Sequence, residues 1–223
     1  MNLGEMSPVE VETAPNPRAT VIWLHGLGAD GHDFEPVVPQ LALSGTWRFV
    51  FPHAPYRPVT INGGYTMRAW YDLGSGPSGL WQNAEHIEQS ARTVAALVEL
   101  ENARGTASEH IVLAGFSQGG VVALMTGLRF PERLAGIIAL SAPLMAADRL
   151  ARSVSAANAS TPVFLGHGLH DARVPIAIGE QAHQKLSGQG IPAEWHVYPM
   201  DHSVCLEELA DISAWLGRIL PLK

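Results

Sequence analysis

Residues 115–119 read Gly-Phe-Ser-Gln-Gly and set one serine, Ser117, between two glycines in a Gly-x-Ser-x-Gly pattern. The apolar run 111–114 precedes this pattern and the helix-like run 120–125 follows it. A strand, a sharp turn and a helix form the setting in which the pattern presents a nucleophilic serine. Both glycines are needed because a Cβ at either position would crowd the strand–helix crossing. The alternative is a glycine-rich helix start at which Ser117 serves only as the N-cap.

A serine hydroxyl is a weak nucleophile, so it requires a base, and the base requires an orienting acid. Asp171 follows one predicted strand, and His202 follows the next predicted strand along the chain. The order Ser117, Asp171, His202 is that of the α/β-hydrolases, whereas two other well-known serine hydrolase folds order the same residues differently. The sequence therefore predicts Ser117 as nucleophile, His202 as general base and Asp171 as the acid that orients it.

Other acids and bases are available. Asp201 and Asp148 are alternatives for the acid, although Asp201 adjoins His202 and would have difficulty folding back onto its ring. For the base, His170 and His53 are the other histidines next to an acid or a strand end.

The cluster His167-x-x-His170-Asp171 contains residue types that ligate metal ions. Hydrolytic zinc sites need three convergent ligands with an open position, and no second cluster in the sequence completes this one. We therefore predict no metal and no organic cofactor.

The first strongly apolar predicted strand runs into a His-Gly-Leu-Gly loop. In this architecture one oxyanion donor is a backbone N–H of that loop, and the other is the N–H of the residue after the nucleophile. Gln118 would supply the second donor. Leu27 is the predicted first donor, with Gly26 or Gly28 as alternatives, and His25 is expected to brace the loop.

The elements that position these residues form an alternating series. Nearly continuous apolar strands between helices indicate a mostly parallel sheet with helices on both faces. Ligands bind beyond the carboxyl ends of such strands, so reactive residues that follow strands meet at one edge. The predicted strands are 19–24, 48–52, 111–115, 134–141, 163–168 and 194–198, and the predicted helices are 33–43, 83–104, 118–129, 176–187 and 204–220.

The region 53–81 breaks this alternation, because it is rich in Gly, Pro, Tyr and Trp and shows no clear period. Long loops of this kind often carry site residues, so we predict part of a substrate pocket here. The alternative is a plain surface excursion with a short hairpin around 62–64. Candidate pocket residues are Met67, Leu73, Trp81 and Val174.

Composition limits the class of protein. The 223 residues are 47% hydrophobic and 16% charged, which fits a single domain over 1–223 with its core at about 19–220. A net charge of −7 argues against binding nucleic acid or an anionic membrane surface. The single cysteine, Cys205, excludes an internal disulfide. With no apparent signal peptide or membrane span, we expect a cytoplasmic protein. About 20 residues separate the strands near 141 and 163, too few for a cap domain.

With these motifs in place, the chain resembles the carboxylesterase and acyl-protein thioesterase family of small α/β-hydrolases, also called the phospholipase/carboxylesterase family. The resemblance extends from about 19 to 220. It implies an α/β-hydrolase fold without a cap domain, the triad Ser117, Asp171 and His202, the oxyanion donors Leu27 and Gln118, and a possible homodimer. The motifs that carry it are 24–28, 68–72, 115–120, 170–175 and 198–202.

The predicted function is that of a serine carboxylesterase that hydrolyses a small-molecule ester through an acyl-enzyme intermediate. Thioesters and esters are cleaved by the same machinery, so an acyl-protein thioesterase and a lysophospholipase are alternatives. Acyl transfer to an acceptor other than water and a non-enzymatic binding module of the same fold are further alternatives.

Overall fold

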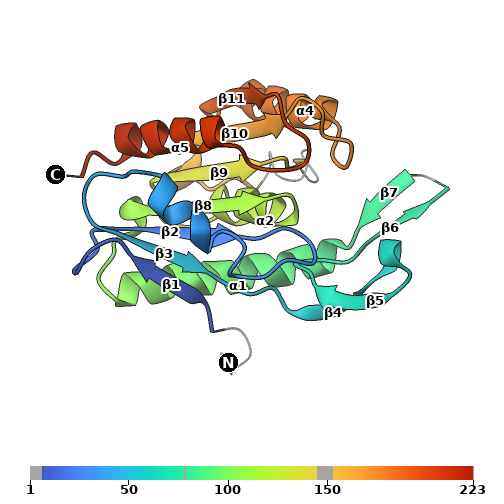
Figure 1. The fold of residues 1–223 in the computed structure, drawn as a ribbon, viewed down its shortest axis with the longest axis horizontal. Helices are drawn as coiled ribbons and strands as arrows, with labels where there is room; N and C mark the ends of the chain where they lie inside the picture. The colour runs from blue at the N-terminus through green and yellow to red at the C-terminus, as the bar shows by residue number, and fades with distance from the viewer. Residues whose placement is uncertain (1–6, 78, 145–152, 223) are drawn as a thin grey trace.

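The computed structural model describes residues 7–77, 79–144 and 153–222. A seven-stranded sheet in the order β1-β3-β2-β8-β9-β10-β11 lies at its centre (Figure 1). Neighbouring strands are parallel except for β1, which runs antiparallel to β3. The strands are β1 Val9–Glu12, β2 Ala19–Leu24, β3 Trp47–Phe51, β8 Ile111–Phe116, β9 Gly136–Leu140, β10 Val163–Gly168 and β11 Ala193–Tyr198.

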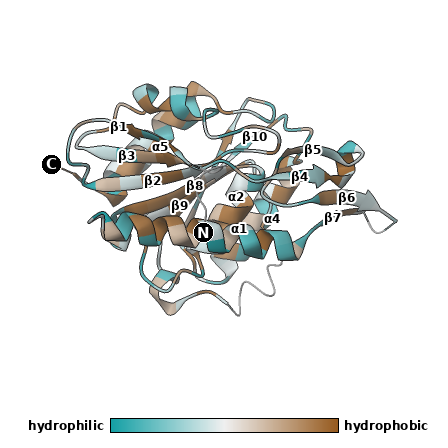
Figure 2. Ribbon diagram, turned by 90° about the horizontal axis from the view of Figure 1, so that it is seen from below, coloured by the Kyte–Doolittle hydropathy of each residue, from teal (hydrophilic) through white to brown (hydrophobic). Residues whose placement is uncertain are grey.

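Both faces of the sheet are apolar, because successive side chains of a strand point to opposite sides. On β8, Ile111 and Leu113 face one buried cluster, and Val112 and Ala114 face the other. Figure 2 shows the resulting hydrophobic sheet between amphipathic helices. The first face is covered by α1 Ala84–Ala103, α2 Gln118–Gly127 and α4 Ile176–Gly188, and the second by α5 Leu206–Ile219 and the 3₁₀ helix η2 Glu35–Gln40.

The mostly parallel sheet with helices on both faces is confirmed, but two local predictions need correction. The predicted helix 33–43 is only the short 3₁₀ segment η2, which contains Pro36 and Pro39. Proline has no N–H to donate, so two prolines this close together prevent a regular α-helix. Strand β1 was not predicted. It is a four-residue edge strand, and its place depends on pairing with β3, where Val9 lies opposite Phe51.

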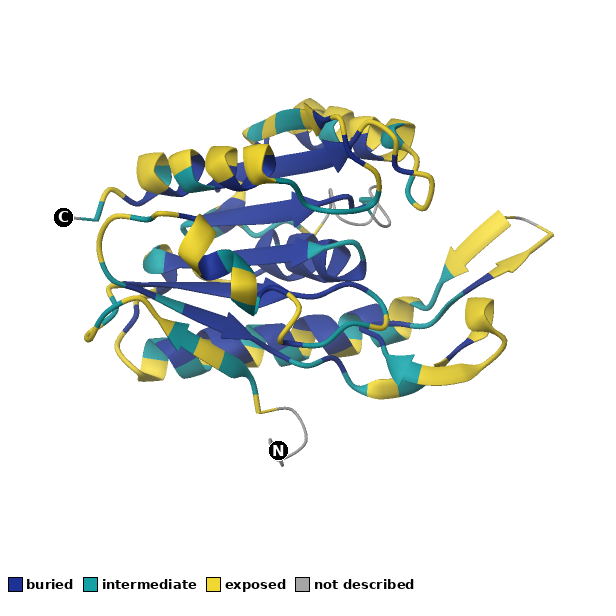
Figure 3. Ribbon diagram, viewed as in Figure 1, coloured by how far each residue is buried: buried dark blue, intermediate teal, exposed yellow. Residues whose placement is uncertain are grey.

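Two antiparallel hairpins occupy most of the region 53–81. The first joins β4 Tyr56–Val59 to β5 Tyr65–Arg68 through the 3₁₀ turn Thr60–Asn62, and Gly63 and Gly64 follow with φ of 67° and 79°. The hairpin around 62–64, which belonged to the surface-excursion alternative, is thus present. The second, between β6 Leu73–Gly76 and β7 Gly79–Gln82, was not predicted. Both project from the body of the protein and are largely exposed (Figure 3).

The strand order reverses its direction at one point of the sheet. The chain passes from β2 to β3 on one side, and β8 lies on the other side of β2. In open α/β sheets, such a reversal separates the loops at the carboxyl ends and leaves room for a ligand. Leu24 at the end of β2 is paired in register with Gly115 near the end of β8. The loop after β2 and the turn after β8 are therefore neighbours.

The turn from β8 into α2 is unusually tight. Ser117 has φ 54° and ψ −117°, a conformation that L-residues rarely adopt. A Cβ at Gly115 would lie 2.2 Å from the carbonyl carbon of Gly119, and a Cβ at Gly119 would lie 2.3 Å from the carbonyl oxygen of Leu24. Both contacts are with backbone, which has little freedom to move. The two glycines are therefore required for β8, α2 and β2 to approach this closely.

We expect Gly119→Ala to lower the free energy of unfolding by roughly 3 kcal/mol, the upper range for overpacking. Gly217→Ala is the matched control, because Gly217 lies in α5 and a Cβ there would meet nothing within 4 Å. It should raise stability by about 0.5–1 kcal/mol, since alanine is the better helix former. Urea unfolding measures both changes, and equal effects of the two substitutions would contradict the close crossing.

Candidate active site

Ser117 stands at the carboxyl end of β8, on the tight turn, and is partly buried. Its backbone N–H donates to the carbonyl oxygen of Leu140 on β9 at 2.8 Å, which ties the turn to the next strand. Ser117 occupies the N-cap position of α2, yet its side chain makes no capping hydrogen bond. The alternative in which Ser117 serves only as a helix cap is therefore not supported. The Ser117 hydroxyl is therefore not used to cap α2.

Asp171 and His202 are brought together by the adjacent strands β10 and β11. The two strands pair in register, with Gly168 opposite Tyr198, so the segments that follow them lie side by side. The Nδ1–H of His202 donates to Oδ2 of Asp171 at 2.6 Å. The Asp171 side chain is fully buried, whereas the His202 side chain is 13% exposed. The predicted acid and base are thus in direct contact.

The ionised form of Asp171 is favoured by its hydrogen bonds. Burial by itself pushes the pKa of this carboxyl upward. The hydrogen bond from His202 and the N–H groups of Val174 and Arg173, which donate to Oδ1 at 2.8 and 2.9 Å, outweigh that effect. The pKa of Asp171 is consequently held below its usual value. At neutral pH the imidazole of His202 therefore faces a carboxylate.

The imidazole of His202 also lies against the turn that carries Ser117. Its ring centroid is 4.6 Å from that of Phe116, the residue before the serine. The nucleophile, base and acid candidates thus follow the carboxyl ends of three strands of one sheet, β8, β11 and β10 respectively.

Three of the other candidates for acid and base lie within the described residues. Asp201 has an exposed side chain, and Asp148 lies outside the described residues. His170 is exposed as well. The Nδ1 of His53 accepts the backbone N–H of Gly31 at 2.9 Å, so this ring supports the loop after β2.

His167 has a structural environment rather than an open metal position. Its ring is buried, and its Nε2–H donates to the carbonyl oxygen of Val174 at 2.8 Å. Within the described ranges, no group of three or more His, Cys, Asp or Glu residues is arranged to hold a metal ion.

The loop after β2 is braced by His25, as predicted from its position. Its Nδ1–H donates to the carbonyl oxygen of Gly26 at 2.7 Å, and its Nε2 accepts the N–H of Ala54 at 3.0 Å. This pattern fixes a single neutral tautomer. Burial lowers the pKa of His25 to about 4 despite its hydrogen bond to Gly26. The His25 ring is therefore neutral at neutral pH and keeps both of its hydrogen bonds.

The same loop approaches Ser117 closely. A Cβ at Gly26 would lie 3.7 Å from the Cβ of Ser117. One residue after Leu27, Gly28 adopts φ 80° and donates its N–H to the carbonyl oxygen of Arg68 at 2.9 Å. Leu27 is therefore held between two fixed neighbours, beside the turn that carries the serine.

The four candidate pocket residues have different surroundings. Met67 lies beside the loop after β2: its sulfur is 3.6 Å from the position that a Cβ would occupy at Gly28. Val174 adjoins Asp171, to which it donates its N–H. Leu73 packs against the main buried cluster, and Trp81 lies across Gly74 of its own hairpin.

Two features of the site escaped prediction from residue types. The buried side chain of Gln118 does not face solvent but contacts the backbone of Trp70 and Tyr71, and the indole of Trp70 contacts the loop after β2. The segment 68–72 was noted only as part of a family resemblance. A tryptophan at this position gives no local signal of its role, since its partners are 45 and 48 residues away.

A buried carboxyl, that of Glu208, lies behind the loop that carries His202. It belongs to the first turn of α5 and packs against Gly166 of β10. Neither of its oxygens has a hydrogen-bond partner among the described residues. Burial, together with the negative charge of Asp211, raises the pKa of Glu208 to about 8. Glu208 is thus the opposite case to Asp171, because no hydrogen bond compensates its burial.

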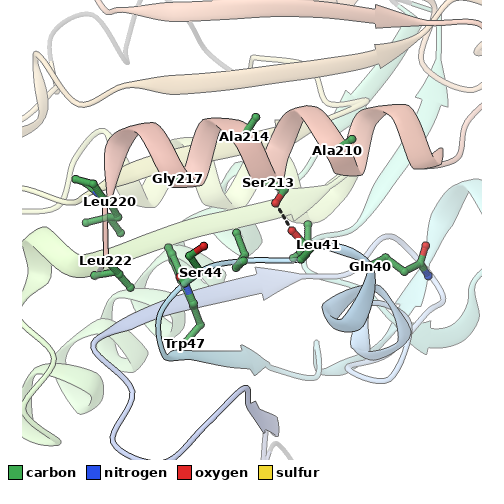
Figure 4. Close-up of a pocket in the computed structure, with 13 residues that line it drawn as sticks. Gln40, Leu41, Ser44, Trp47, Ala210, Ser213, Ala214, Gly217, Leu220 and Leu222 are labelled. Atoms are coloured by element: carbon green, nitrogen blue, oxygen red, sulfur yellow. Dashed lines mark hydrogen bonds between the residues drawn. The ribbon is translucent and has the colours of Figure 1, made fainter.

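An apolar groove of about 590 Å³ lies apart from these residues, between α5 and the segment that leads into β3 (Figure 4). Leu41, Trp47, Ala214 and Leu220 are among its lining residues, and Ser213 donates a hydrogen bond to the carbonyl oxygen of Leu41 across it. It holds none of the candidate acid, base or nucleophile residues.

In the part of the chain that is described, no helix is long and apolar enough to cross a membrane.

Comparison with known proteins agrees with this geometry. The model of the phospholipase/carboxylesterase family matches residues 7–220. The chain belongs to this family. It is 36% identical to an acyl-protein thioesterase 1 of Gibberella zeae over 240 aligned residues, which cover both proteins completely. The resemblance inferred from the motifs is confirmed, and the chain is an ester or thioester hydrolase.

Solved structures of relatives show the same fold. The crystal structure of Arabidopsis thaliana SOBER1 has a TM-score of 0.85 and 31% identity, and the match covers 91% of this chain and 99% of that one. The structure of Zea mays acyl-protein thioesterase 2 has a TM-score of 0.83 and 26% identity, with 95% and 99% covered. The α/β-hydrolase fold without a separate cap domain is thereby confirmed.

Glu208 leads to a prediction about pH. Its pKa is raised in the folded state, so the folded protein binds more protons than the unfolded chain between about pH 4.5 and 8. Over that interval this group lowers the free energy of unfolding as pH rises, by at most roughly 1.4 kcal/mol per pH unit. Glu208→Gln keeps the shape and removes the titration. We expect the variant to gain stability relative to the wild type as pH increases, which urea unfolding at several pH values measures. A constant difference between the two proteins would contradict the raised pKa.

Proposed function

We propose that the protein is a serine carboxylesterase in which Ser117, His202 and Asp171 form a catalytic triad. The observation that carries this proposal is the partly buried Asp171–His202 hydrogen bond of 2.6 Å, together with the contact of the His202 imidazole with Phe116, next to Ser117. The strained backbone of Ser117 supports it further, because conformations of this kind are concentrated at functional sites.

In the proposed mechanism, the Ser117 hydroxyl attacks the carbonyl carbon of the ester while Nε2 of His202 takes its proton. Asp171 holds Nδ1–H and stabilises the imidazolium that forms. His202 then gives the proton to the departing alcohol, which leaves an acyl group on Ser117. In the second half, His202 activates a water molecule that releases the acid. The cycle needs no metal or organic cofactor.

The negative charge that develops on the carbonyl oxygen requires donors already in place. We assign these to the N–H groups of Leu27 and Gln118. The first N–H groups of a helix have no partner within it, and Gln118 is the first residue of α2. Leu27 lies on the loop that approaches the Cβ of Ser117. Gly26 and Gly28 are the alternative donors, but Gly28 already donates to Arg68.

The acyl group would lie along the hairpins. Met67 beside the loop after β2 and Val174 beside Asp171 are the inner candidates for contact, and Leu73 and Trp81 are the outer ones. Exposed Tyr56, Tyr65 and Leu80 add apolar surface to the two hairpins, as expected of a site for apolar acyl chains. Acyl-protein thioesterase and lysophospholipase activities are the alternatives, and one relative carries the first of these names. A homodimer and a cytoplasmic location stay predictions.

The triad is tested with p-nitrophenyl butyrate. We expect Ser117→Ala to lower kcat by several orders of magnitude, and Asp171→Asn to lower it about 10⁴-fold, because the imidazole would then adopt the wrong tautomer. Ser187→Ala, an exposed serine of α4, is the control and should keep wild-type activity. Full activity of Ser117→Ala would show that another residue is the nucleophile.

The substrate class is tested by measuring kcat/KM for a series of acyl esters and the matching thioesters. A carboxylesterase should be fastest with acyl chains from butyrate to octanoate, because the site has no cap that encloses a long chain. Highest activity with palmitoyl thioesters would instead favour the acyl-protein thioesterase alternative. Product analysis in the presence of added alcohols would detect acyl transfer to acceptors other than water.

A further inference from the structure

The two proposed oxyanion donors belong to separate parts of the chain. Leu27 lies on the loop after β2, and Gln118 begins α2. Hydrogen bonds to a developing oxyanion are effective only within a narrow range of distance, so the spacing of the two N–H groups must be fixed. Sheet pairing between β2 and β8 ends at Leu24 and Gly115, before either donor. Some other contact has to hold them.

Trp70 contacts both donor segments. Its indole Nε1–H donates to the carbonyl oxygen of His25 at 2.8 Å, and its backbone N–H donates to Oε1 of the Gln118 side chain at 3.0 Å. Trp70 is 1% exposed and Gln118 is 4% exposed, so water does not compete for either bond. A single residue thus joins the loop of one donor to the residue that supplies the other.

The side chain of Gln118 completes this connection. Its Nε2 donates to the carbonyl oxygen of Tyr71 at 2.9 Å, so the carboxamide makes one bond to each of two successive residues. Its amide orientation is fixed by these partners, a backbone donor and a backbone acceptor. The contact restrains the first residue of α2, whose backbone N–H is the proposed donor.

Further bonds immobilise the segment around Trp70. The hydroxyl of Ser90 on α1 donates to the Trp70 carbonyl oxygen at 2.5 Å, and the carbonyl oxygen of Arg68 accepts the N–H of Gly28 at 2.9 Å. The rings of Trp70 and His25 have centroids 5.3 Å apart. The segment is thus anchored to α1 on one side and to the loop after β2 on the other.

We propose that Trp70 is a positioning residue that sets the spacing of the Leu27 and Gln118 N–H groups in the oxyanion hole. Trp70 acts through the His25 carbonyl oxygen and through the Gln118 carboxamide, and it does not touch the reacting atoms. The inference rests on the proposed esterase mechanism and assigns a role to the tryptophan of the segment 68–72.

The test compares p-nitrophenyl butyrate with its thionoester, in which sulfur replaces the carbonyl oxygen. Sulfur is larger and accepts hydrogen bonds weakly, so a well-spaced oxyanion hole favours the oxygen ester. The ratio of the two kcat/KM values does not depend on how much of the enzyme is folded. A purely structural role for Trp70 would therefore leave the ratio unchanged.

Trp70→Phe keeps an aromatic ring and removes the indole N–H. We expect kcat for the oxygen ester to fall about 10- to 100-fold, less than the 10²–10³-fold loss of a whole oxyanion donor, with KM nearly unchanged. The preference for the oxygen ester should fall about 10-fold. Gln118→Met retains the length of the side chain without the amide, and it should shift both quantities in the same direction even if Trp70→Phe does not fold.

Trp47→Phe is the matched control. Trp47 is equally buried, and its Nε1–H donates to the carbonyl oxygen of Ser44 at 2.8 Å, beside the groove and away from Ser117. This variant should keep the wild-type ratio. An unchanged ratio in both Trp70→Phe and Gln118→Met, or an equal change in Trp47→Phe, would overturn the inference. If the wild type cleaves neither ester, the proposed function itself is wrong and the inference fails with it.

Discussion

The conformation of Ser117 is the constraint on which the arrangement of the site depends. A residue with positive φ at the end of a buried strand costs about 1–3 kcal/mol and persists only where its surroundings leave no alternative. Gly115 and Gly119 allow β8, α2 and β2 to approach to backbone contact. The hydrogen bond from the Ser117 N–H to Leu140 adds β9 to this support. The serine is thus held by three strands and one helix.

Burial acts differently on the ionisable groups around this turn. Asp171 receives three hydrogen bonds, so its pKa falls although it is buried. The carboxyl of Glu208 receives none from the described part of the chain, and its pKa rises. Both ring nitrogens of His25 are bonded to backbone, which leaves this ring neutral and structural. His202 uses one ring nitrogen for Asp171, and in the proposed mechanism the other transfers the proton. The hydrogen-bond partners, more than burial alone, distinguish the proposed working groups from the supporting ones.

The hairpins and the proposed oxyanion hole share a common support. Asp72 accepts hydrogen bonds from the N–H and the hydroxyl of Thr60 in the first hairpin. Its carbonyl oxygen accepts the N–H of Asn83 at the start of α1. Trp70, two residues earlier, bonds to the segments of both donors. The hairpins proposed to contact substrate are therefore linked through a segment of three residues to the proposed oxyanion donors.

The sequence by itself determined the strand–turn–helix around Ser117, the order Ser117, Asp171, His202 and the parallel sheet, because each produces a local pattern of apolar runs, glycines and strand ends. Contacts between distant residues were decided only by the tertiary structure. Strand β1 depends on its pairing with β3, and the bonds of Trp70 reach partners 45 and 48 residues away. The prolines of η2 shortened a helix that periodicity alone had favoured. Local sequence encodes which elements form, whereas the spacing of side chains between elements results from packing the whole sheet.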